Sequence, residues 1–376
     1  MNRPVAALAQ ALQCALDARR FSGVQLQVGT RDAVVASFAM GHTAYPADDA
    51  LVRPVTALTR FDTASLTKAL VTSLLAMHAV AAGKMRLDQP LEALLPPDVN
   101  LTQRQPLTID RLLAHRSGLP AWRNFYQRLD PPSVATSQAL LQVRQWCAHA
   151  ELDPERRQCY SDLGYILLHW ALEECLAAPL DRAFHTLIAS PLGLTQSAFA
   201  PLPQGLAPAE CVATERCPWR GLLQGSVHDD NAWAMGGVAG HAGLFSTATD
   251  IGTIARALLR ADPAPLPFDA ATLDLFWSDH FNDGDTFRLG WDTPSGPQSL
   301  AGAYATPGAT FGHLGFTGCS LWLDRARQAY AVLLTNRVHP RRDSDNLRTW
   351  RASVHDLAWD AIDDLAPRQD AAGPTS

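Results

Sequence analysis

The sequence predicts an α+β protein in which one antiparallel sheet is built from the two ends of the chain and flanked by N- and C-terminal helices. Strand-like apolar runs lie near the N-terminus, at 24–29 and 33–41, and near the C-terminus, at 311–325 and 328–338. The stretch between them, from 63 to 200, has mostly helical spacing. Strands at both ends with helices between them favour a single sheet with an inserted, mainly helical domain.

The remaining elements follow from periodicity and from Pro and Gly boundaries. In chain order we expect a helix at 1–20, a strand at 59–63, a helix at 63–83, a loop-rich segment at 201–244, helices at 247–261 and 268–277, a strand at 286–293 and a helix at 346–365. The predicted domains are a discontinuous sheet domain, an inserted helical domain with the helix of Ser65 at the interface, and a disordered tail; they span 1–62 with 245–365, 63–244, and 366–376.

The composition excludes several classes of protein. The chain has 376 residues, of which 47% are hydrophobic and 18% charged, with a formal net charge of −6. This acidic balance lacks the basic face that phosphate binding needs, so no nucleic-acid partner is expected. The most apolar stretches are interrupted by His, Ser, Thr or Glu and fall short of a membrane span.

Two features bear on the compartment. The first twenty residues read as an amphipathic helix without the features of a signal peptide. The seven cysteines are scattered and form no C-x-x-C pair, which does not suggest a disulfide framework. We therefore expect a cytoplasmic protein, with the periplasm as the less favoured alternative.

The segment FDTASLTKAL contains a candidate nucleophile, Ser65, three residues before Lys68. Of the 31 basic residues only Lys68 and Lys84 are lysine. Arginine stays protonated, whereas a lysine amine releases its proton when burial or a neighbouring charge lowers its pKa. One helical turn places the Ser65 hydroxyl beside the Lys68 amine, which could then accept the hydroxyl proton. A surface lysine is the alternative, because Ser-x-x-Lys also arises by chance.

Two later stretches carry polar residues at the ends of predicted elements. Tyr160 and Ser161 precede a helix expected to begin near Asp162, where Ser and Asp also serve as helix caps. His313 and Gly315 lie on a predicted strand, in which glycine often marks the close approach of a backbone or ligand. Taken singly, each stretch has a structural explanation.

The order of these three stretches resembles the motif pattern of the serine hydrolases related to penicillin-binding proteins and class C β-lactamases. The segments LTIDRLLAHRSGLP, LIASPLGLTQSAF and GGVAGHAGLFSTATDIG look like that family too, and the resemblance extends from about residue 20 to 340. It implies a β-lactamase/transpeptidase-like fold and a reaction through an acyl-enzyme, with no metal or organic cofactor.

The resemblance also implies a role for each motif residue. Ser65 would be the acylated nucleophile and Lys68 would assist its deprotonation. Tyr160 would be the shared general base, which requires its pKa to be depressed by a cation such as Lys68. The backbone N–H groups of Ser65 and Phe316 would form the oxyanion hole. Asp162, His313 and Gly315 would contact the substrate.

Two departures from the β-lactamase pattern bear on the substrate. Asp162 stands where β-lactamases usually have Asn, and an ionised carboxylate only accepts hydrogen bonds. His313 replaces a permanent cation, which weakens attraction for the carboxylate of lactams and D-alanyl peptides. Both departures disfavour a β-lactamase and favour a substrate that offers an amine or a hydroxyl.

Other histidines and acids have structural interpretations. His228, Asp229, Asp230 and His241 are metal-ligand types, but their spacing matches no standard zinc site, and we interpret the segment as a polar loop near the cleft. His115 is expected to end a helix, where it suits the helix dipole.

We therefore predict a serine hydrolase that acts through an acyl-enzyme, and favour an amidase or peptidase acting on a small peptide or peptidoglycan fragment such as a muramyl peptide. The alternatives are a carboxylesterase for short acyl esters, a β-lactamase, and a noncatalytic protein that binds wall fragments or forms a scaffold.

Overall fold

The structure is a computed structural model of the chain. It describes residues 3–46, 51–97, 99, 101, 106–129, 137–201, 204–261, 265–281, 284–296, 298–343 and 347–364. The predicted tail at 366–376 lies outside the described residues. In the described part of the chain, no helix has the length and apolar character needed to cross a membrane.

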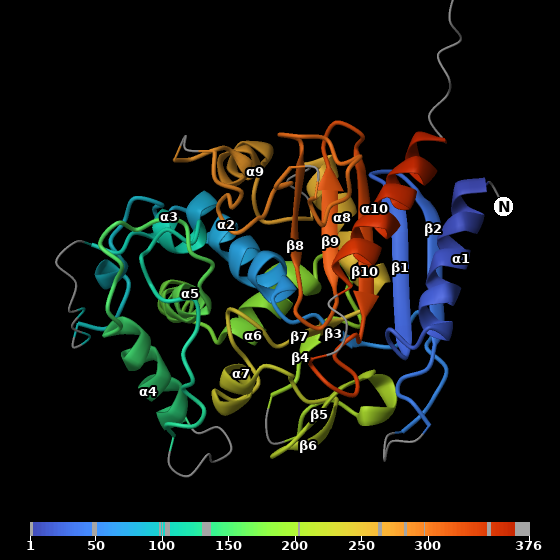
Figure 1. Cartoon of the computed structure of the whole chain (residues 1–376). Coiled ribbons are helices and arrows are strands. Elements are labelled where there is room, and N and C mark those ends of the chain that lie inside the picture. The colour runs from blue at the N-terminus through green and yellow to red at the C-terminus, as the bar shows by residue number, and fades with distance from the viewer. Residues whose placement is uncertain are drawn as a thin grey trace, which may run out of the picture.

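The two ends of the chain form one five-stranded antiparallel sheet, which confirms the predicted α+β class (Figure 1). Its strand order is β2-β1-β10-β9-β8. The N-terminal strand β1 pairs with the C-terminal strand β10, with Val24 opposite Thr335. These strands are β1 (Gly23–Thr30), β2 (Val34–Gly41), β8 (Thr310–Leu314), β9 (Ser320–Asp324) and β10 (Ala329–Thr335).

Helices cover both faces of this sheet. The terminal helices α1 (Arg3–Asp17) and α10 (Arg348–Asp363) share one hydrophobic cluster with Val24 and Leu26 of β1. The alternate residue Gln25 points to the other face, where its Oε1 accepts the Ala248 N–H at 2.8 Å and fixes the start of α8 (Ala248–Arg260). The period-two alternation of β1 therefore separates two helical layers.

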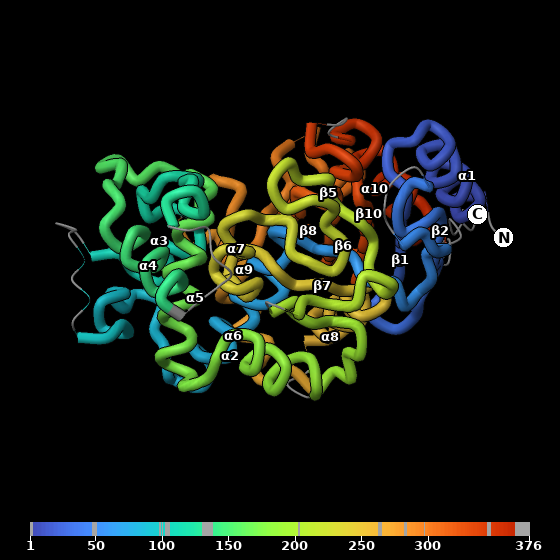
Figure 2. Tube along the Cα trace, turned by 90° about the horizontal axis from the view of Figure 1, so that it is seen from below, coloured from blue at the N-terminus to red at the C-terminus, as the bar shows by residue number. Residues whose placement is uncertain are grey.

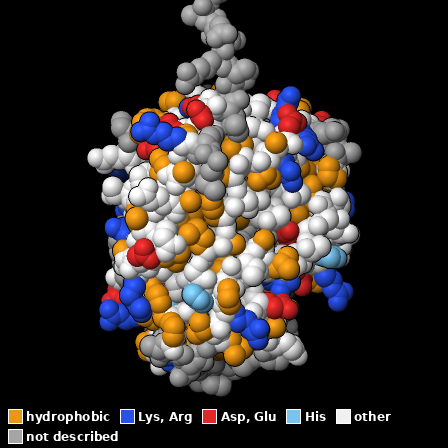
Figure 3. Space-filling view, turned by 90° about the vertical axis from the view of Figure 1, so that its right-hand side faces the viewer, with side chains coloured by type: hydrophobic (Ala, Val, Ile, Leu, Met, Phe, Trp, Pro, Cys, Tyr) orange, Lys and Arg blue, Asp and Glu red, His pale blue; other side chains and the backbone are white. Residues whose placement is uncertain are grey.

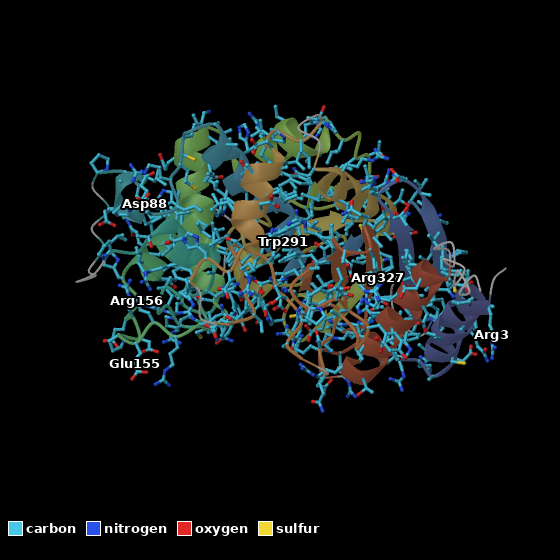
Figure 4. All side chains as sticks on the ribbon, turned by 90° about the horizontal axis from the view of Figure 1, so that it is seen from above. Arg3, Asp88, Glu155, Arg156, Trp291 and Arg327 are labelled. Carbon is cyan, nitrogen blue, oxygen red and sulfur yellow. The ribbon has the colours of Figure 1, made fainter. Side chains whose placement is uncertain are left out.

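The remaining helices form the other half of the molecule, away from α1 and β2 (Figures 1 and 2). They are α2 (Leu74–Ala81), α3 (Ile109–Leu113), α4 (Ser137–Ala148), α5 (Asp162–Leu176), α6 (Leu180–Phe184), α7 (Asp230–Ala234) and α9 (Ala270–Trp277). The buried Trp291 lies near the centre, between this half and the sheet, whereas Arg3 and Asp88 lie toward opposite ends (Figure 4). On the α1 side, charges of both signs are interspersed with hydrophobic side chains (Figure 3).

Two small sheets complete the fold. One contains β3 (Phe61–Asp62), β7 (Leu244–Ser246) and β4 (Ala198–Phe199), and the other is the hairpin of β5 (Ala213–Cys217) and β6 (Gly221–Gln224). The proposed domain boundaries, after residues 62 and 244, both fall at the pair β3 and β7. We propose that this small sheet is the junction between the two domains.

Three strand predictions are corrected. The predicted strand at 286–293 is wrong: apart from one bridge between Asp292 and Gly312 the segment is irregular, because Gly290 has a φ of 88° and turns the chain. The run at 311–325 is two strands, β8 and β9, joined by a turn that contains Gly318 at φ 109°. The strand at 59–63 is reduced to β3 and lies outside the main sheet.

Candidate active site

The candidate nucleophile Ser65 lies on a tight turn at the end of β3. The residue before it, Ala64, has a φ of 48°, which L-residues other than Gly, Asn and Asp adopt rarely. The buried carboxylate of Asp62 accepts the Ala64 N–H at 2.8 Å and thereby holds this conformation. The helix that follows begins with a π-helical segment, Lys68–Ser73, and continues as α2. π-Helical turns are frequent at functional sites.

Lys68 is fully buried one turn after Ser65. Its Nζ donates to Ser65 Oγ at 3.0 Å, to Asp162 Oδ1 at 2.7 Å and to the His241 carbonyl at 3.1 Å. All three ammonium protons therefore have acceptors. A planar guanidinium does not match three acceptors converging on one atom, which gives a geometric reason for lysine at this position.

The charge state of Lys68 differs from the expected neutral amine. Burial alone lowers the pKa of Lys68, but the charges of Asp162 and Tyr160 and hydrogen bonds with both raise it above the ordinary value. The expectation of a neutral resting amine is therefore wrong. Lys68 keeps its proton because Asp162 pairs with it. Asp162 was expected to contact the substrate instead.

Tyr160 lies beside Lys68, whose Nζ is 4.7 Å from the centre of the tyrosine ring. His115 forms hydrogen bonds with the residues on both sides of Tyr160. Its carbonyl accepts the Cys159 N–H at 2.8 Å, and its Nδ1 accepts the Ser161 N–H at 3.0 Å. The two rings are also in contact, with centroids 4.5 Å apart. His115, expected only to end a helix, thus positions Tyr160 from both sides.

The expected depression of the Tyr160 pKa is wrong as well. Burial raises the pKa of Tyr160 above its ordinary value, although the charge of Lys68 acts in the opposite direction. The negative charge of Asp162 reinforces the increase. The effect of burial outweighs the charge of Lys68, and Tyr160 rests as a neutral phenol.

Ser161 and Asp162 have both roles that the sequence left open. Ser161 caps α5, with its Oγ accepting the Gly164 N–H at 3.3 Å. Asp162 is the first residue of α5 and carries its carboxylate to Lys68. The helix cap and the polar site are therefore built by consecutive residues.

The side chain of His313 lines the same cavity and is neutral. Its Nδ1 donates to the Leu314 carbonyl at 2.8 Å, and its buried Nε2 has no partner in the described part of the chain. Burial and the charge of Lys68 lower the pKa of His313 to about 3. The ring therefore offers an acceptor lone pair at Nε2 and no positive charge.

Gly315 and Phe316 follow β8 and run past the Ser65 turn. A Cβ atom on Gly315 would lie 2.4 Å from the Thr63 carbonyl oxygen, so the glycine permits a close approach of two backbones. Thr317 Oγ1 donates to the Asp62 carbonyl at 2.7 Å and joins the same two segments. Among the described residues, neither the Ser65 N–H nor the Phe316 N–H has a protein acceptor.

These residues open onto one cavity of about 550 Å³. It combines the motif residues with apolar groups, acids and a group of arginines. Its lining comprises Ala64, Ser65, Trp122, Tyr160, Asp162, His228, Asp229, Asp230, Ala242, Phe287, Asp292, Leu300, His313, Leu314, Gly315, Phe316, Arg337, Arg342, Arg348 and Arg351. Lys68 lies behind this wall, hydrogen-bonded to Ser65.

The residues of the 228–241 loop are engaged in separate pairs. His228 Nε2 lies 2.9 Å from Glu215, and His241 Nε2 lies 3.0 Å from Asp229. Ligand atoms of Asp162, Asp229 and His241 lie within 4.8 Å of one another. The Lys68 ammonium already contacts Asp162 and the His241 carbonyl, so a positive charge of the protein itself occupies the neighbourhood of this cluster.

Sequence reasoning missed Asp62 and the arginines. Asp62 directly precedes the Ser65 turn, and its place at the end of a strand was a signal that could have been used. Arg351 lies almost at the other end of the chain, on α10, and no local pattern links it to Ser65. Burial lowers the pKa of Arg351 to about 10, and the charges of Arg337 and Arg348 act in the same direction.

Comparisons with known proteins agree with this arrangement. The family model described as Beta-lactamase matches residues 8–355. The chain is 31% identical over 347 residues to an N-acetylmuramyl-L-alanine amidase of Bacillus subtilis (strain 168), covering 85% of this chain and 78% of that protein. It is also 31% identical over 350 residues to a putative D-alanyl-D-alanine carboxypeptidase of Salmonella enteritidis PT4 (strain P125109), covering 85% and 79%.

Among solved structures, EstCE1, a hydrolase with promiscuous acyltransferase activity, has a TM-score of 0.75. Its identity is 21%, over 95% of this chain and 99% of that chain, so this likeness concerns the fold. The family match spans nearly the whole chain, and two relatives exceed 30% identity. The chain therefore belongs to the β-lactamase family and is a β-lactamase-fold hydrolase.

Proposed function

We propose that the protein hydrolyses an amide bond of a small peptide or peptidoglycan fragment through an acyl-enzyme at Ser65. The observation that carries this proposal is the continuous hydrogen-bonded path from Ser65 Oγ through Lys68 Nζ to Asp162 Oδ1. The names of the relatives, an amidase and a putative carboxypeptidase, favour amide substrates.

In the proposed cycle Lys68 first passes a proton to Asp162, 2.7 Å away. The neutral amine then accepts the Ser65 hydroxyl proton while the Ser65 oxygen bonds to the substrate carbonyl carbon. The N–H groups of Ser65 and Phe316 stabilise the oxyanion. As the carbon–nitrogen bond breaks, Tyr160 gives its proton to the leaving amine and takes one from Lys68. Water then attacks the ester and delivers its proton to the neutral Lys68 amine. Lys68 returns that proton to Ser65 as the bond between the carbonyl carbon and the Ser65 oxygen breaks, and Asp162 finally returns its proton to Lys68.

The arginines support a substrate with a carboxylate. Arg337, Arg348 and Arg351 line the cavity. Arg351 is 4% exposed, and among the residues that the structure describes its Nε has no hydrogen-bond partner. These arginines supply the attraction for a carboxylate that His313, standing in place of a permanent cation, lacks. A peptide that ends in a free carboxylate suits this wall, as guanidinium groups bind carboxylates with charge-assisted hydrogen bonds.

Esterase activity is the second candidate, favoured by the apolar part of the lining. Trp122, Phe287, Leu314 and Phe316 offer a surface for an acyl chain, and the same nucleophile serves both reactions. The β-lactamase and noncatalytic alternatives are separated from these by the following experiment.

The test is an intact-protein mass spectrum after brief incubation with an activated short-chain ester, with an activated D-alanyl peptide analogue, or with a penicillin. We expect a mass increase in the wild type that is absent in Ser65→Ala and Lys68→Arg. Lys84→Arg is the matched control, because Lys84 is exposed on a turn and should leave the adduct unchanged. An adduct that survives Ser65→Ala, or no adduct with any reagent, contradicts the proposal. A penicillin adduct that persists indicates that the lactam acylates Ser65 without turnover, whereas rapid loss of the adduct indicates β-lactamase turnover.

A further inference from the structure

Two carboxylates face the same part of the cavity. Asp162 and Asp229 both line it, and their ligand atoms lie within 4.8 Å of each other and of His241. Their side chains are 17% and 25% exposed. Asp162 belongs to α5 and Asp229 caps α7, so the tertiary fold brings the two charges together.

Each of these carboxylates uses only one of its oxygens within the protein. Asp162 Oδ1 accepts from Lys68, and Asp229 Oδ1 accepts from His241 at 3.0 Å and from the Ala232 N–H at 2.7 Å. Within the described residues, neither Oδ2 accepts a hydrogen bond. Two acceptor oxygens are thus left where a bound molecule reaches them.

A third acceptor lies on the same wall. His228 is 4% exposed, and its Nε2 is held by the carboxylate of Glu215, which Arg342 also binds. A carboxylate only accepts, so Nε2 carries a proton, and in the neutral imidazole Nδ1 is then the acceptor. Nδ1 has no partner among the described residues, although the ring lines the cavity.

The protein itself holds the Asp229 carboxylate in its ionised form. Lys68 is the permanent cation in contact with Asp162. Burial opposes ionisation of Asp229, but the charge of His241 and hydrogen bonds from His241 and Ala232 hold the pKa of Asp229 well below its ordinary value. Asp230, the next residue, differs because Arg220 and Arg342 cover its oxygens.

We propose that Asp162, Asp229 and His228 form a subsite for a primary ammonium group, so that the substrate is an acyl donor with a free amino group near the scissile carbonyl. A primary ammonium has three N–H donors, and the subsite offers three acceptors. Asp162 is hydrogen-bonded to Lys68, which is hydrogen-bonded to Ser65. An ammonium group of the substrate bound at Asp162 would therefore lie within a few covalent bonds of the substrate carbonyl at Ser65, as in an aminoacyl amide or an N-terminal residue. The location of the carbonyl rests on the proposed function of Ser65.

The first test measures binding without turnover, in the Ser65→Ala background. Calorimetric titration with alaninamide and with N-acetylalaninamide, in both chiral forms, compares a ligand that has the ammonium with one that lacks it. We expect one chiral form of alaninamide to bind at least about tenfold more tightly than its acetylated analogue, as expected for loss of a charge-assisted hydrogen bond. This preference should decline above pH about 8, where an α-amino group loses its proton.

Two further variants test whether Asp229 causes the preference for alaninamide over N-acetylalaninamide. Adding Asp229→Asn should abolish the preference, while the amide oxygen keeps the helix cap and the contact with His241. Adding Asp230→Asn changes the formal charge equally but should preserve the preference. Equal binding of the two ligands, binding of neither, or equal effects of the two variants overturns the subsite.

The subsite and the proposed function fail in different ways. If Ser65 is acylated by N-acetylated and free-amine esters at equal rates, the subsite is wrong and the acyl-enzyme stands. If alaninamide binds with the expected dependence on Asp229 but no reagent acylates Ser65, the subsite stands and the proposed function is wrong.

Discussion

The cavity has two chemically opposite sides, separated by the ring of Phe316. On the acceptor side lie Asp162, His228 and Asp229, and the His228 ring stacks on Phe316 with centroids 5.7 Å apart. On the arginine side lie Arg337, Arg348 and Arg351, and the Arg337 guanidinium is 4.7 Å from the centre of the same ring.

The two sides differ in how their charges are held. On the acceptor side Asp162 is paired with a cation of the protein, and proton transfer between them is part of the proposed chemistry. On the arginine side three guanidinium groups line the cavity, and the charges of Arg337 and Arg348 lower the pKa of Arg351. One side is therefore suited to move protons and the other to bind, although both line the same space.

Breaking the acceptor side at Asp162 has the largest expected effect. Asp162→Asn keeps the shape but removes the proton acceptor, and kcat for an activated ester should fall by about 10²- to 10³-fold, the range of general acid–base contributions. Without Asp162 the Lys68 ammonium must lose its proton to solvent, so the rate of the variant should rise with pH over a range in which the wild-type rate changes little.

Asp230→Asn is the control for this change, since Asp230 is bound to Arg220 and has no contact with Lys68. A rate loss in Asp162→Asn without this new pH dependence would contradict the assignment of Asp162 as the proton acceptor of Lys68.

The pH dependence of the wild-type reaction rate tests the protonation states on the acceptor side. The pKa values of Lys68 and Tyr160 are both raised, so the form that lacks one proton becomes common only at alkaline pH. In the proposed cycle the Lys68 proton passes to Asp162 and stays on the enzyme, so kcat/KM for an uncharged ester should change little from neutrality up to the raised pKa of Lys68. His313, with its pKa at about 3, should add no limb between pH 5 and 8.

Stopped assays over this range, on protein whose fold is checked by circular dichroism, provide the measurement. A bell-shaped profile centred near pH 6 to 7 would show that a histidine controls the reaction instead.

Breaking the arginine side should weaken binding and leave the chemistry intact. Arg351→Gln should raise KM by about tenfold for a substrate with a free carboxylate, because a charge-assisted hydrogen bond is lost. The methyl ester or amide of the same substrate should keep its KM, and kcat should change little for either.

Arg351→Lys tests the need for a guanidinium at this position, and a thermal melt of each variant separates binding from unfolding. An equal rise in KM for the charged and uncharged substrates would contradict the role of Arg351 in binding the carboxylate.

The smallest expected effect concerns the anchoring of α10, which carries Arg348 and Arg351. His355 of α10 is fully buried, with its Nδ1 2.6 Å from the Leu300 carbonyl. Burial lowers the pKa of His355 to about 3 from an ordinary value of 6.5. Between these values the unfolded chain binds a proton that the folded chain does not, so stability present above pH 6.5 is lost as the pH falls.

We therefore expect the melting temperature to decline from pH 7 to pH 4 by several degrees, and His355→Gln to flatten that decline while lowering the value at pH 7. His149→Gln, a change at an exposed histidine, is the control. An unchanged slope in His355→Gln would show that other groups account for the acid sensitivity.

The sequence located the parts of the site that are encoded locally. Ser65 and Lys68 are one turn apart, and Ser161 and Asp162 begin a helix, so spacing and capping rules place each group on its own element. The antiparallel sheet was predicted because strand alternation is visible at both ends of the chain. The strand predicted at 286–293 was wrong because apolar residues there pack in irregular backbone around Gly290.

The charge states required contacts that no local pattern contains. Lys68 was expected to be neutral, and Tyr160 acidic, because the pairing of Lys68 with Asp162, distant in the sequence, was not foreseen. In the same way, His313 in place of a cation suggested weak attraction for a carboxylate, whereas Arg351 lines the cavity from the C-terminal helix.

The sequence by itself determined the elements, the order of the motifs and the chemical types available for catalysis, because these depend on residues within one turn or one strand. Only the tertiary structure decided which charges are neighbours. The pKa of a buried group depends on burial and on charges within a few ångströms, and folding brings those charges together from distant parts of the chain. For this protein, the sequence was enough to find Ser65 and Lys68. Their protonation states and the two sides of the cavity became known only from the tertiary structure.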